Sequence, residues 1–384
     1  MSAQGAAFRL ATYYSALFAA VGVHLPFWPL WLKDRGLSPT EIGLILATTY
    51  LVKSIVNPLI GHLVDRRGER RRPMLWLAAA AALAWMGFAL TSGFWPILIL
   101  TVVALGLWSG IMPIGEALAL RTTQAHGIDY GRVRLWGSAA FIATAIACGR
   151  LLVDQPPAIL VWLIAGLLAV MALTCAALPD TRVAVPEGGR SLPLKPLVTS
   201  AAFLLFLTAG SLNSASHTVY YAFSTIHWKA AGIPDDTIGL LWSEGVIAEI
   251  VLFAMSGRVV RRCGPAGLLA LAGLAGVVRW TTLGLTTELP LLAAAQLLHA
   301  ATFACAHLGA MHFLRGVPDG LAARAQGIYA AVALGVAPGL MSPFTGRLYE
   351  ALGGHAFLVM GVLSALMALA AAQMARLRPA GKPL

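Results

Sequence analysis

Apolar runs of about 20 residues follow one another from end to end of this 384-residue chain. A helix of that length spans a hydrocarbon layer about 30 Å thick and satisfies its backbone hydrogen bonds internally, where no water is available. The runs are continuous rather than alternating, which favours helices over the strands of a membrane barrel. The composition agrees, because 59% of the residues are hydrophobic and only 11% are charged. The sequence therefore predicts an all-α integral membrane protein.

Twelve predicted transmembrane helices account for these runs, with boundaries set to within a few residues. No small-residue cleavage site interrupts the first run, so we expect it to be retained as a helix. The predicted helices cover residues 8–32, 39–62, 73–92, 96–120, 132–153, 157–178, 197–222, 237–257, 265–285, 289–314, 323–345 and 355–376.

The distribution of lysine and arginine predicts the orientation of the helices. The chain has 27 of these residues, and all but Lys53 and Arg279 lie in or beside the predicted loops. Alternate loops carry 20 and 5 of them, and the positive-inside rule places the richer side in the cytoplasm. We therefore expect a multi-pass protein of a bacterial cytoplasmic (inner) membrane with both termini cytoplasmic. This topology and anionic lipid explain the net charge of +11 without a nucleic-acid partner.

An internal repeat divides the chain into two similar halves. Residues 41–68 align without a gap on residues 237–264, and seven positions are identical at a constant offset of 196. Two halves of the same orientation need an even number of helices each, as in the six-plus-six secondary transporters built from parallel repeats. We predict an N-terminal half over 1–178, a Pro- and Gly-containing cytoplasmic linker over 179–196 and a C-terminal half over 197–384.

Two opposite charges occupy matching positions of the repeat. Lys53 lies inside the second apolar run and corresponds to Glu249 in the other half. A charge near the bilayer centre costs ~2.5–3.5 kcal/mol even on permissive insertion scales, so we expect both to face the protein interior or a water-filled cavity. Each could be a structural ion-pair partner or part of a transport mechanism. Loss of hydration favours the protonated form of a carboxyl group, which makes Glu249 a candidate proton carrier.

The segment after the second predicted helix carries a recognisable loop. The run "GHLVDRRGERRR" resembles the signature loop of the major facilitator superfamily. This resemblance implies the major facilitator fold, with twelve transmembrane helices in two pseudo-symmetric six-helix halves, and a gating role for the loop. The matching positions are Gly61, Asp65, Arg66, Gly68 and Arg70.

Further motifs resemble a narrower group, the bacterial 3-phenylpropionate transporter family, and more distantly lactose permease. They include "LPFWPLWLKDRGLSPTEIGL", "DYGRVRLWGSAAF" and "LLHAATFACAHLGAMHF", and they come from both halves of the chain. The resemblance implies a proton-coupled symporter of a small organic acid, an aromatic carboxylate, that works by alternating access. Similar transporters often differ in cargo, so a sugar or nucleoside symporter of the same fold and an efflux antiporter are alternatives.

Several polar residues of the apolar runs form a candidate substrate site. Glu116 and Arg134 resemble the acid and the arginine that bind sugar in lactose permease, although their places at helix ends also fit a loop anchor with its counter-ion. His217 follows Asn213 by one helical turn and is a candidate for a substrate contact or for a helix–helix hydrogen bond. The predicted substrate-binding set is Lys53, Glu116, Arg134, Asn213, His217 and His307.

A second candidate set concerns proton coupling. Glu249, Arg279 and His299 resemble the acid, arginine and histidine that couple protons in lactose permease. That permease has a further acid in its tenth helix, which has no counterpart here. His299 and Glu244 are alternatives to Glu249 as the proton carrier, since the ordinary titration range of histidine already lies near neutral pH.

The sequence shows no sign of enzyme chemistry, a cofactor or a metal site. It contains no HExxH motif, no paired cysteines and no GxSxG in a fitting context. The expected partners are a small-molecule substrate, protons and the lipid bilayer, and we expect the protein to act as a monomer. The aromatic runs "PFWPLW" and "FWP" lie at ends of predicted helices and are typical of interfacial belts.

Overall fold

The structure of the chain is a computed structural model, which describes residues 2–67, 69–179 and 193–377. All regular secondary structure in these ranges is helical, as the apolar runs predict. Ten stretches of the described residues are long and apolar enough to cross a membrane. The chain forms two compact units, Met1–Pro186 with Gly232–Ser243, and Glu187–Ala231 with Glu244–Leu384.

The ten stretches contain eleven of the twelve predicted helices. The missing one, 197–222, is broken at His217 into α9 (Ala201–Ser216) and α10 (Thr218–Ala230), and each piece is too short to count as a span. The last two predicted helices run on as one stretch, Gly320–Leu377. The ten stretches differ in number from the twelve predicted helices because one helix is broken and two others form one continuous stretch. The division into halves at residues 178 and 197 stays a prediction.

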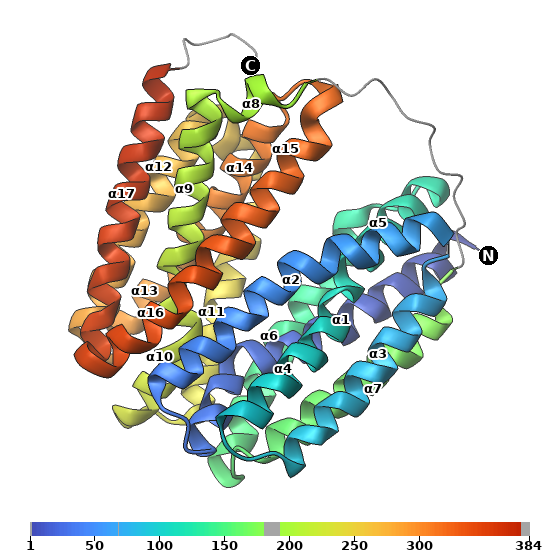
Figure 1. Cartoon of the computed structure of the whole chain (residues 1–384), viewed down its shortest axis with the longest axis vertical. Helices are drawn as coiled ribbons and strands as arrows, with labels where there is room; N and C mark the ends of the chain where they lie inside the picture. Colours follow the sequence, from blue (N-terminus) through green and yellow to red (C-terminus); the bar gives the residue numbers. More distant parts are fainter. Residues whose placement is uncertain (1, 68, 180–192, 378–384) are drawn as a thin grey trace. The chain divides into compact units, whose positions relative to one another are not determined.

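The first unit is a bundle in which α1 packs against α6 and α7, and α3 packs against α4 and α7 (Figure 1). The Asp129 side chain caps the start of α6 by accepting hydrogen bonds from two backbone N–H groups, and Gly127 ends α5 with φ 63°. The helices are α1 (Ala3–Asp34), α2 (Pro39–Arg67), α3 (Arg71–Met86), η1 (Gly87–Leu90), α4 (Phe94–Ser109), α5 (Ile111–His126), α6 (Tyr130–Asp154), α7 (Ile159–Ala177) and the start of α11 (Asp235–Ala254).

Close contact between α1 and α6 depends on a glycine. A Cβ at Gly22 would lie 2.7 Å from the carbonyl oxygen of Phe141, which is closer than real Cβ atoms come to other atoms. Beside it, the Thr144 hydroxyl of α6 donates a hydrogen bond to the Ala19 carbonyl oxygen of α1 over 3.1 Å. Small residues with a hydroxyl partner are the usual means of close helix packing where lipid removes the hydrophobic driving force.

The interpretation of "PFWPLW" as an interfacial belt is wrong. Trp28 and Trp31 are buried at 1% and 0% exposure, and their rings stack with centroids 4.4 Å apart. Trp85 of α3 and His24 of α1 join the same cluster. Offset and edge-to-face ring contacts stabilise such clusters beyond area burial, so these rings hold α1 against α3. Trp95 of the second run is 68% exposed, as a belt residue should be.

The second unit contains the remaining helices, with α17 packed along α9 and α12, and α12 packed on α14 (Figure 1). Its elements are α8 (Lys195–Val198), α9, α10, the end of α11, α12 (Ser256–Leu285), α13 (Leu289–Leu297), η2 (Ala300–Cys305), α14 (Ala306–Leu314), α15 (Asp319–Ala331), η3 (Val332–Val336), α16 (Ala337–Leu352), η4 (Gly353–His355) and α17 (Ala356–Leu377). The segments η2 and η3 are π-helical turns inside longer helices.

Two backbone features set the shape of α12. Gly264 adopts φ 62° and precedes Pro265, so the helix changes direction where the predicted span 265–285 begins. Further along, a Cβ on Gly273 would lie 2.7 Å from the backbone nitrogen of Ala368 in α17. The glycine therefore permits the close contact of α12 with α17, and this contact fixes the helix that carries Arg279.

Candidate functional site

Arg279 is the centre of a connected polar cluster in the second unit. The side chain projects from α12 and is 0% exposed. Its Nη1 donates to Nδ1 of His299 and to the hydroxyl of Thr302, both over 3.0 Å, and its Nη2 donates to Oε1 of Gln296 over 2.9 Å. The guanidinium also lies over the ring of Tyr220, 4.5 Å from its centroid. We call these residues, with His217 and Glu249, the Arg279 cluster.

The contacts of His299 determine its protonation state. An arginine side chain can only donate hydrogen bonds, so Nδ1 of His299 must accept from Arg279 and carries no proton. The proton of the neutral ring is then on Nε2, which lies 3.6 Å from Oε2 of Glu249. The neutral ring of His299 thus lies between the buried guanidinium of Arg279 and the carboxylate of Glu249. Among the described residues, no carboxylate pairs directly with Arg279.

A second branch of the cluster ends at His217. Nδ1 of His217 donates to the carbonyl oxygen of Asn213 over 2.8 Å, which leaves Nε2 as an acceptor 3.4 Å from the Thr302 hydroxyl. His217 is therefore also neutral in this arrangement. His217 thus contacts the backbone carbonyl of Asn213, and the predicted substrate contact of these two residues stays a prediction.

Irregular backbone places these side chains together. His217 stands at the break between α9 and α10. Thr302 lies inside the π-turn η2, which begins directly after His299. A π-turn inserts one extra residue into a helix and is frequent at functional sites. Sequence spacing counted on a regular α-helix does not predict which way side chains point beyond such a turn.

The other predicted residues of the second unit lie at the edge of the cluster. The Glu249 side chain of α11 is 21% exposed. His307 of α14 interacts electrostatically with Glu249, and its ring lies edge-on to that of Phe253. Glu244, the alternative carrier, is half-buried on the same helix, and no contact of its side chain with Arg279 or His299 is found among the described residues.

Glu116 and Arg134 form a smaller cluster in the first unit. Nε of Arg134 lies 3.5 Å from Oε1 of Glu116, and both side chains are about a quarter exposed, at 27% and 26%. The hydroxyls of Tyr14 and Tyr130 both donate to Oε2 of Glu116. The Arg134 guanidinium lies 3.9 Å from the centroid of the Phe18 ring. The predicted pair is therefore a contact, and it sits among aromatic rings.

Lys53 stands apart from both clusters. It is exposed on α2, and it interacts electrostatically with His24 of α1 in the same unit. Its ammonium group makes no ion pair among the described residues.

The predicted gating loop is described only in part. Gly61, Asp65 and Arg66 lie in α2, but only their places in the helix are described, and Gly68 is outside the described structure entirely. Arg70 precedes α3 and is buried at 4% exposure. The gating role of these residues stays a prediction.

Sequence reasoning missed the residues that complete both clusters. Gln296, Thr302 and Tyr220 hold Arg279, and Tyr14 and Tyr130 hold Glu116. Gln296 is the one amide in the apolar run "LLAAAQLLHAA". A polar residue inside such a run indicates a position that faces the protein interior, so Gln296 could have been found from the sequence. Threonine and tyrosine are common in transmembrane helices, so the other residues gave no such signal. In the described part of the chain, no group of three or more His, Cys, Asp or Glu side chains could hold a metal ion.

Comparison with solved structures shows the fold. The crystal structure of a mutant of the nucleoside transporter NupG matches 96% of this chain and 99% of its own with a TM-score of 0.87, at 15% sequence identity. At this level of sequence identity the likeness shows the fold alone, which is all-helical in the described residues.

The chain belongs to the family described as the MFS_1 like family, whose pattern matches residues 7–359. It is 34% identical to the probable 3-phenylpropionic acid transporter of Escherichia coli (strain K12) over 367 residues, which cover 92% of this chain and 94% of that protein. It is also 26% identical to the maltose permease of Geobacillus stearothermophilus, covering 88% and 86% of the two chains. The resemblance seen in the sequence motifs is thereby confirmed.

Proposed function

We propose that the protein is a proton-coupled symporter of a small aromatic carboxylic acid and that Glu249 carries the proton. The observation that carries the proposal is the chain of contacts from Arg279 through neutral His299 to Glu249. In such an arrangement the acid can take up a proton while the cation binds the substrate anion in its place. A proton-coupled transporter requires this exchange.

The coupling follows from charge. While Glu249 is ionised, its carboxylate balances Arg279 through His299. When Glu249 takes up a proton, Arg279 loses that balance and attracts an anion more strongly. By linkage, the bound anion must favour protonation of Glu249 to the same extent. Substrate and proton then bind together and leave together, as symport demands.

Arg279 has a donor left for a carboxylate. Its Nε is buried and has no hydrogen-bond partner among the described residues, while both Nη atoms are occupied. A buried N–H without a partner costs free energy, so an anion that accepts this bond gains affinity. The rings of Tyr220 and Trp280 at 4.5 and 4.6 Å from the guanidinium suit an aromatic acid.

The substrate class rests on the named relative, which is a probable 3-phenylpropionic acid transporter. A sugar or nucleoside symporter is the second candidate, because a maltose permease is a relative and a nucleoside transporter shares the fold. The contact of Glu116 with Arg134 also favours it, since an acid paired with an arginine can bind hydroxyl groups. Efflux by antiport is a third alternative, because the fold alone does not set the direction of transport.

A binding screen separates the candidates. Purified protein is heated with 3-phenylpropionate, related aromatic acids, maltose and uridine, and its unfolding temperature is recorded. A ligand present at 100 times its Kd stabilises the folded state by ~2.7 kcal/mol, which gives a clear shift. We expect a shift with aromatic acids and none with the neutral ligands. A shift with maltose or uridine alone would replace the acid with the second candidate.

Other expectations from the sequence stay proposals. They are the cytoplasmic position of both termini in a bacterial inner membrane, the monomeric state, and the linker over residues 179–196, most of which lies outside the described residues. The lysine and arginine bias supports the orientation.

A further inference from the structure

A proton carried by Glu249 has to return to water in every transport cycle, and His299 offers no route for it. Nδ1 of His299 accepts from Arg279, so the neutral ring holds its one proton on Nε2, toward Glu249. Giving up that proton would leave an anionic imidazole, and taking a second proton would break the bond to Arg279. The side of Glu249 that faces His299 is therefore closed to protons, and another group has to connect the carboxylate to water.

His307 is the second imidazole near this carboxylate. It belongs to α14 and interacts electrostatically with Glu249. Its ring lies edge-on to that of Phe253, with the ring centroids 6.0 Å apart, and Phe253 follows Glu249 by one turn of α11. His307 therefore faces the part of α11 that carries the acid. No hydrogen bond holds its ring in the part of the chain that the structure describes, so the ring can turn between partners.

Exposure rises from Arg279 toward His307. Arg279 is fully buried, the His299 side chain is 11% exposed, Glu249 is more exposed than His299, and His307 is classed as exposed. His307 lies seven residues before the end of the apolar stretch Leu289–Leu314, which is about 10 Å along the helix. An ionisable side chain at this depth faces a water-filled path or other polar groups rather than lipid. His307 thus lies between Glu249 and water.

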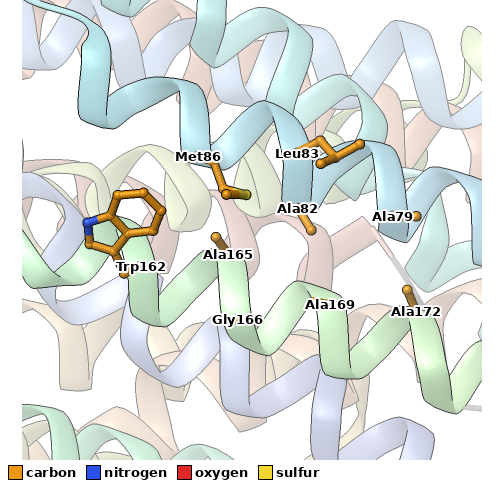
Figure 2. A pocket seen from close by; sticks show the side chains of 9 residues that line it. All are labelled: Ala79, Ala82, Leu83, Met86, Trp162, Ala165, Gly166, Ala169 and Ala172. Atoms are coloured by element: carbon orange, nitrogen blue, oxygen red, sulfur yellow. The ribbon is translucent and has the colours of Figure 1, made fainter.

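The chemistry of imidazole suits this position. A neutral imidazole has one donor and one acceptor, and its ordinary titration range lies near neutral pH, so it can take a proton on one nitrogen and release one from the other. An apolar surface cannot do this. The groove between α3 and α7 in the first unit, for example, is lined by alanine, glycine, leucine, methionine and one tryptophan (Figure 2).

We propose that His307 is the proton relay of Glu249, which takes the proton from the carboxyl group and passes it to water on the side of the membrane where α14 ends. In the transfer the O–H bond of Glu249 breaks and an N–H bond forms on His307, which leaves a carboxylate beside an imidazolium until water accepts the proton. The relay rests on the proposed function, in which Glu249 carries the proton. With both termini cytoplasmic, α14 ends in the cytoplasm, and His307 then acts in the release step of uptake.

Transport by the full chain in proteoliposomes separates proton release from substrate binding. Uptake against a gradient requires proton release in every cycle, whereas counterflow exchange does not. Neither glutamine nor phenylalanine titrates, so we expect His307→Gln and His307→Phe to lower proton-driven uptake of 3-phenylpropionate at least tenfold and to keep counterflow within twofold of the parent. His312→Gln is the matched control and should behave as the parent, because His312 is exposed on the same helix and no contact with Glu249 is found among the described residues.

A pH indicator dye in detergent solution counts the protons taken up when 3-phenylpropionate binds. The count should be the same in His307→Gln as in the parent, because Glu249 still carries the proton. A lower count would make His307 itself the carrier and overturn the relay.

Two transport results would also overturn it. One is proton-driven uptake by both His307 variants within twofold of the parent. The other is loss of counterflow together with uptake, which would make His307 the substrate contact that the sequence predicts. A parent that shows neither proton-driven uptake nor proton binding would reject the proposed function, and the relay with it.

Discussion

A single hydrogen bond decides the chemistry of His299. Because the Arg279 guanidinium only donates, the imidazole can gain a second proton only by giving up this contact. Among the members of the Arg279 cluster, Glu249 is the group that can take up a proton without breaking a bond to Arg279. The geometry therefore favours the carboxylate as carrier and gives His299 a positioning role.

Replacing Glu249 tests this assignment. Glu249→Gln keeps the shape of the side chain and mimics its protonated state. We expect loss of uptake against a gradient, with binding and exchange of substrate retained, because exchange across the loaded carrier never has to release the proton. Substrate binding by the variant should also lose the pH dependence of the parent. Radiolabelled uptake and counterflow in proteoliposomes measure both activities.

Two results would contradict this role. Retained proton-driven accumulation would transfer it to His299 or Glu244, whereas loss of binding would make Glu249 a substrate ligand or structural partner. Glu288, which lies in the loop before α13, provides a matched control, and Glu288→Gln should behave as the parent.

Substitutions of His299 distinguish a positioning residue from a proton carrier. The amide of glutamine offers an acceptor to Arg279 and a donor to Glu249, as the neutral imidazole does. We expect His299→Gln to keep coupled uptake within about tenfold. His299→Phe leaves Arg279 one hydrogen bond short, which costs ~1–3 kcal/mol, and should lower uptake ~10- to 100-fold. If His299→Gln lost coupling as completely as His299→Phe, the histidine itself would be the carrier.

At the scale of helices, small residues set how closely the elements approach. Gly273 permits the contact of α12 with α17, and Gly22 permits that of α1 with α6. These helices carry the clusters, so close packing in each unit supports the positions of the polar groups. The π-turn η2 and the break at His217 then turn particular side chains toward Arg279.

A pair of alanine substitutions tests this packing. Gly273→Ala places a Cβ against the backbone of α17 and should destabilise the fold by ~1–3 kcal/mol through overpacking. Gly166→Ala adds the same methyl group to open space and should gain up to ~1 kcal/mol of helix propensity. Thermal unfolding in one detergent compares the two. Equal unfolding temperatures would show that α12 and α17 can separate without cost.

The loop after α2 is the second test at this scale. Its resemblance to the superfamily loop suggests that Asp65 holds one conformation closed through charge contacts between helices. Asp65→Asn should then lower transport at least ~10-fold, since a charge-assisted hydrogen bond contributes ~1.5–3 kcal/mol, while membrane insertion is unchanged. Quantitative uptake normalised to protein in the membrane is the measurement. Normal turnover in the variant would leave the loop with a topological role alone.

For the whole molecule, the sign of the substrate charge is the central question. Lys53 and Arg279 supply positive charge inside apolar runs, and Arg134 supplies it near the start of α6. An arginine can hold a carboxylate by two parallel hydrogen bonds. We expect 3-phenylpropionate to compete for binding at least ~100-fold better than its neutral amide, a difference of ~2.7 kcal/mol. Competition binding with both compounds is the measurement. Equal competition would reject the organic acid and favour the sugar or nucleoside alternative.

Much of the architecture could be predicted because the membrane imposes it locally. The thickness of the hydrocarbon layer fixes the length of each helix, and the cost of unpaired backbone groups excludes other structures. The runs of apolar residues therefore indicated the helices and the fold class. A charged side chain inside an apolar run is also costly, because lipid does not solvate charge. Glu249 and Arg279 therefore stood out in the sequence before any contact was known.

Only the tertiary structure decided which of these groups touch. Gln296 and Tyr220 come from separate helices, and no local pattern brings them to Arg279. The burial of Trp28 and Trp31 likewise depends on rings from distant parts of the chain, such as Trp85 of α3 beside Trp28. Hydropathy describes how well each residue suits a lipid environment. Which side chains meet depends instead on how each helix is rotated, on the glycines at helix contacts and on the π-turns. By itself, the sequence determined the apolar helices, the class of transporter and the charges inside the apolar runs, and packing decided the hydrogen bonds that set the protonation states of His217 and His299.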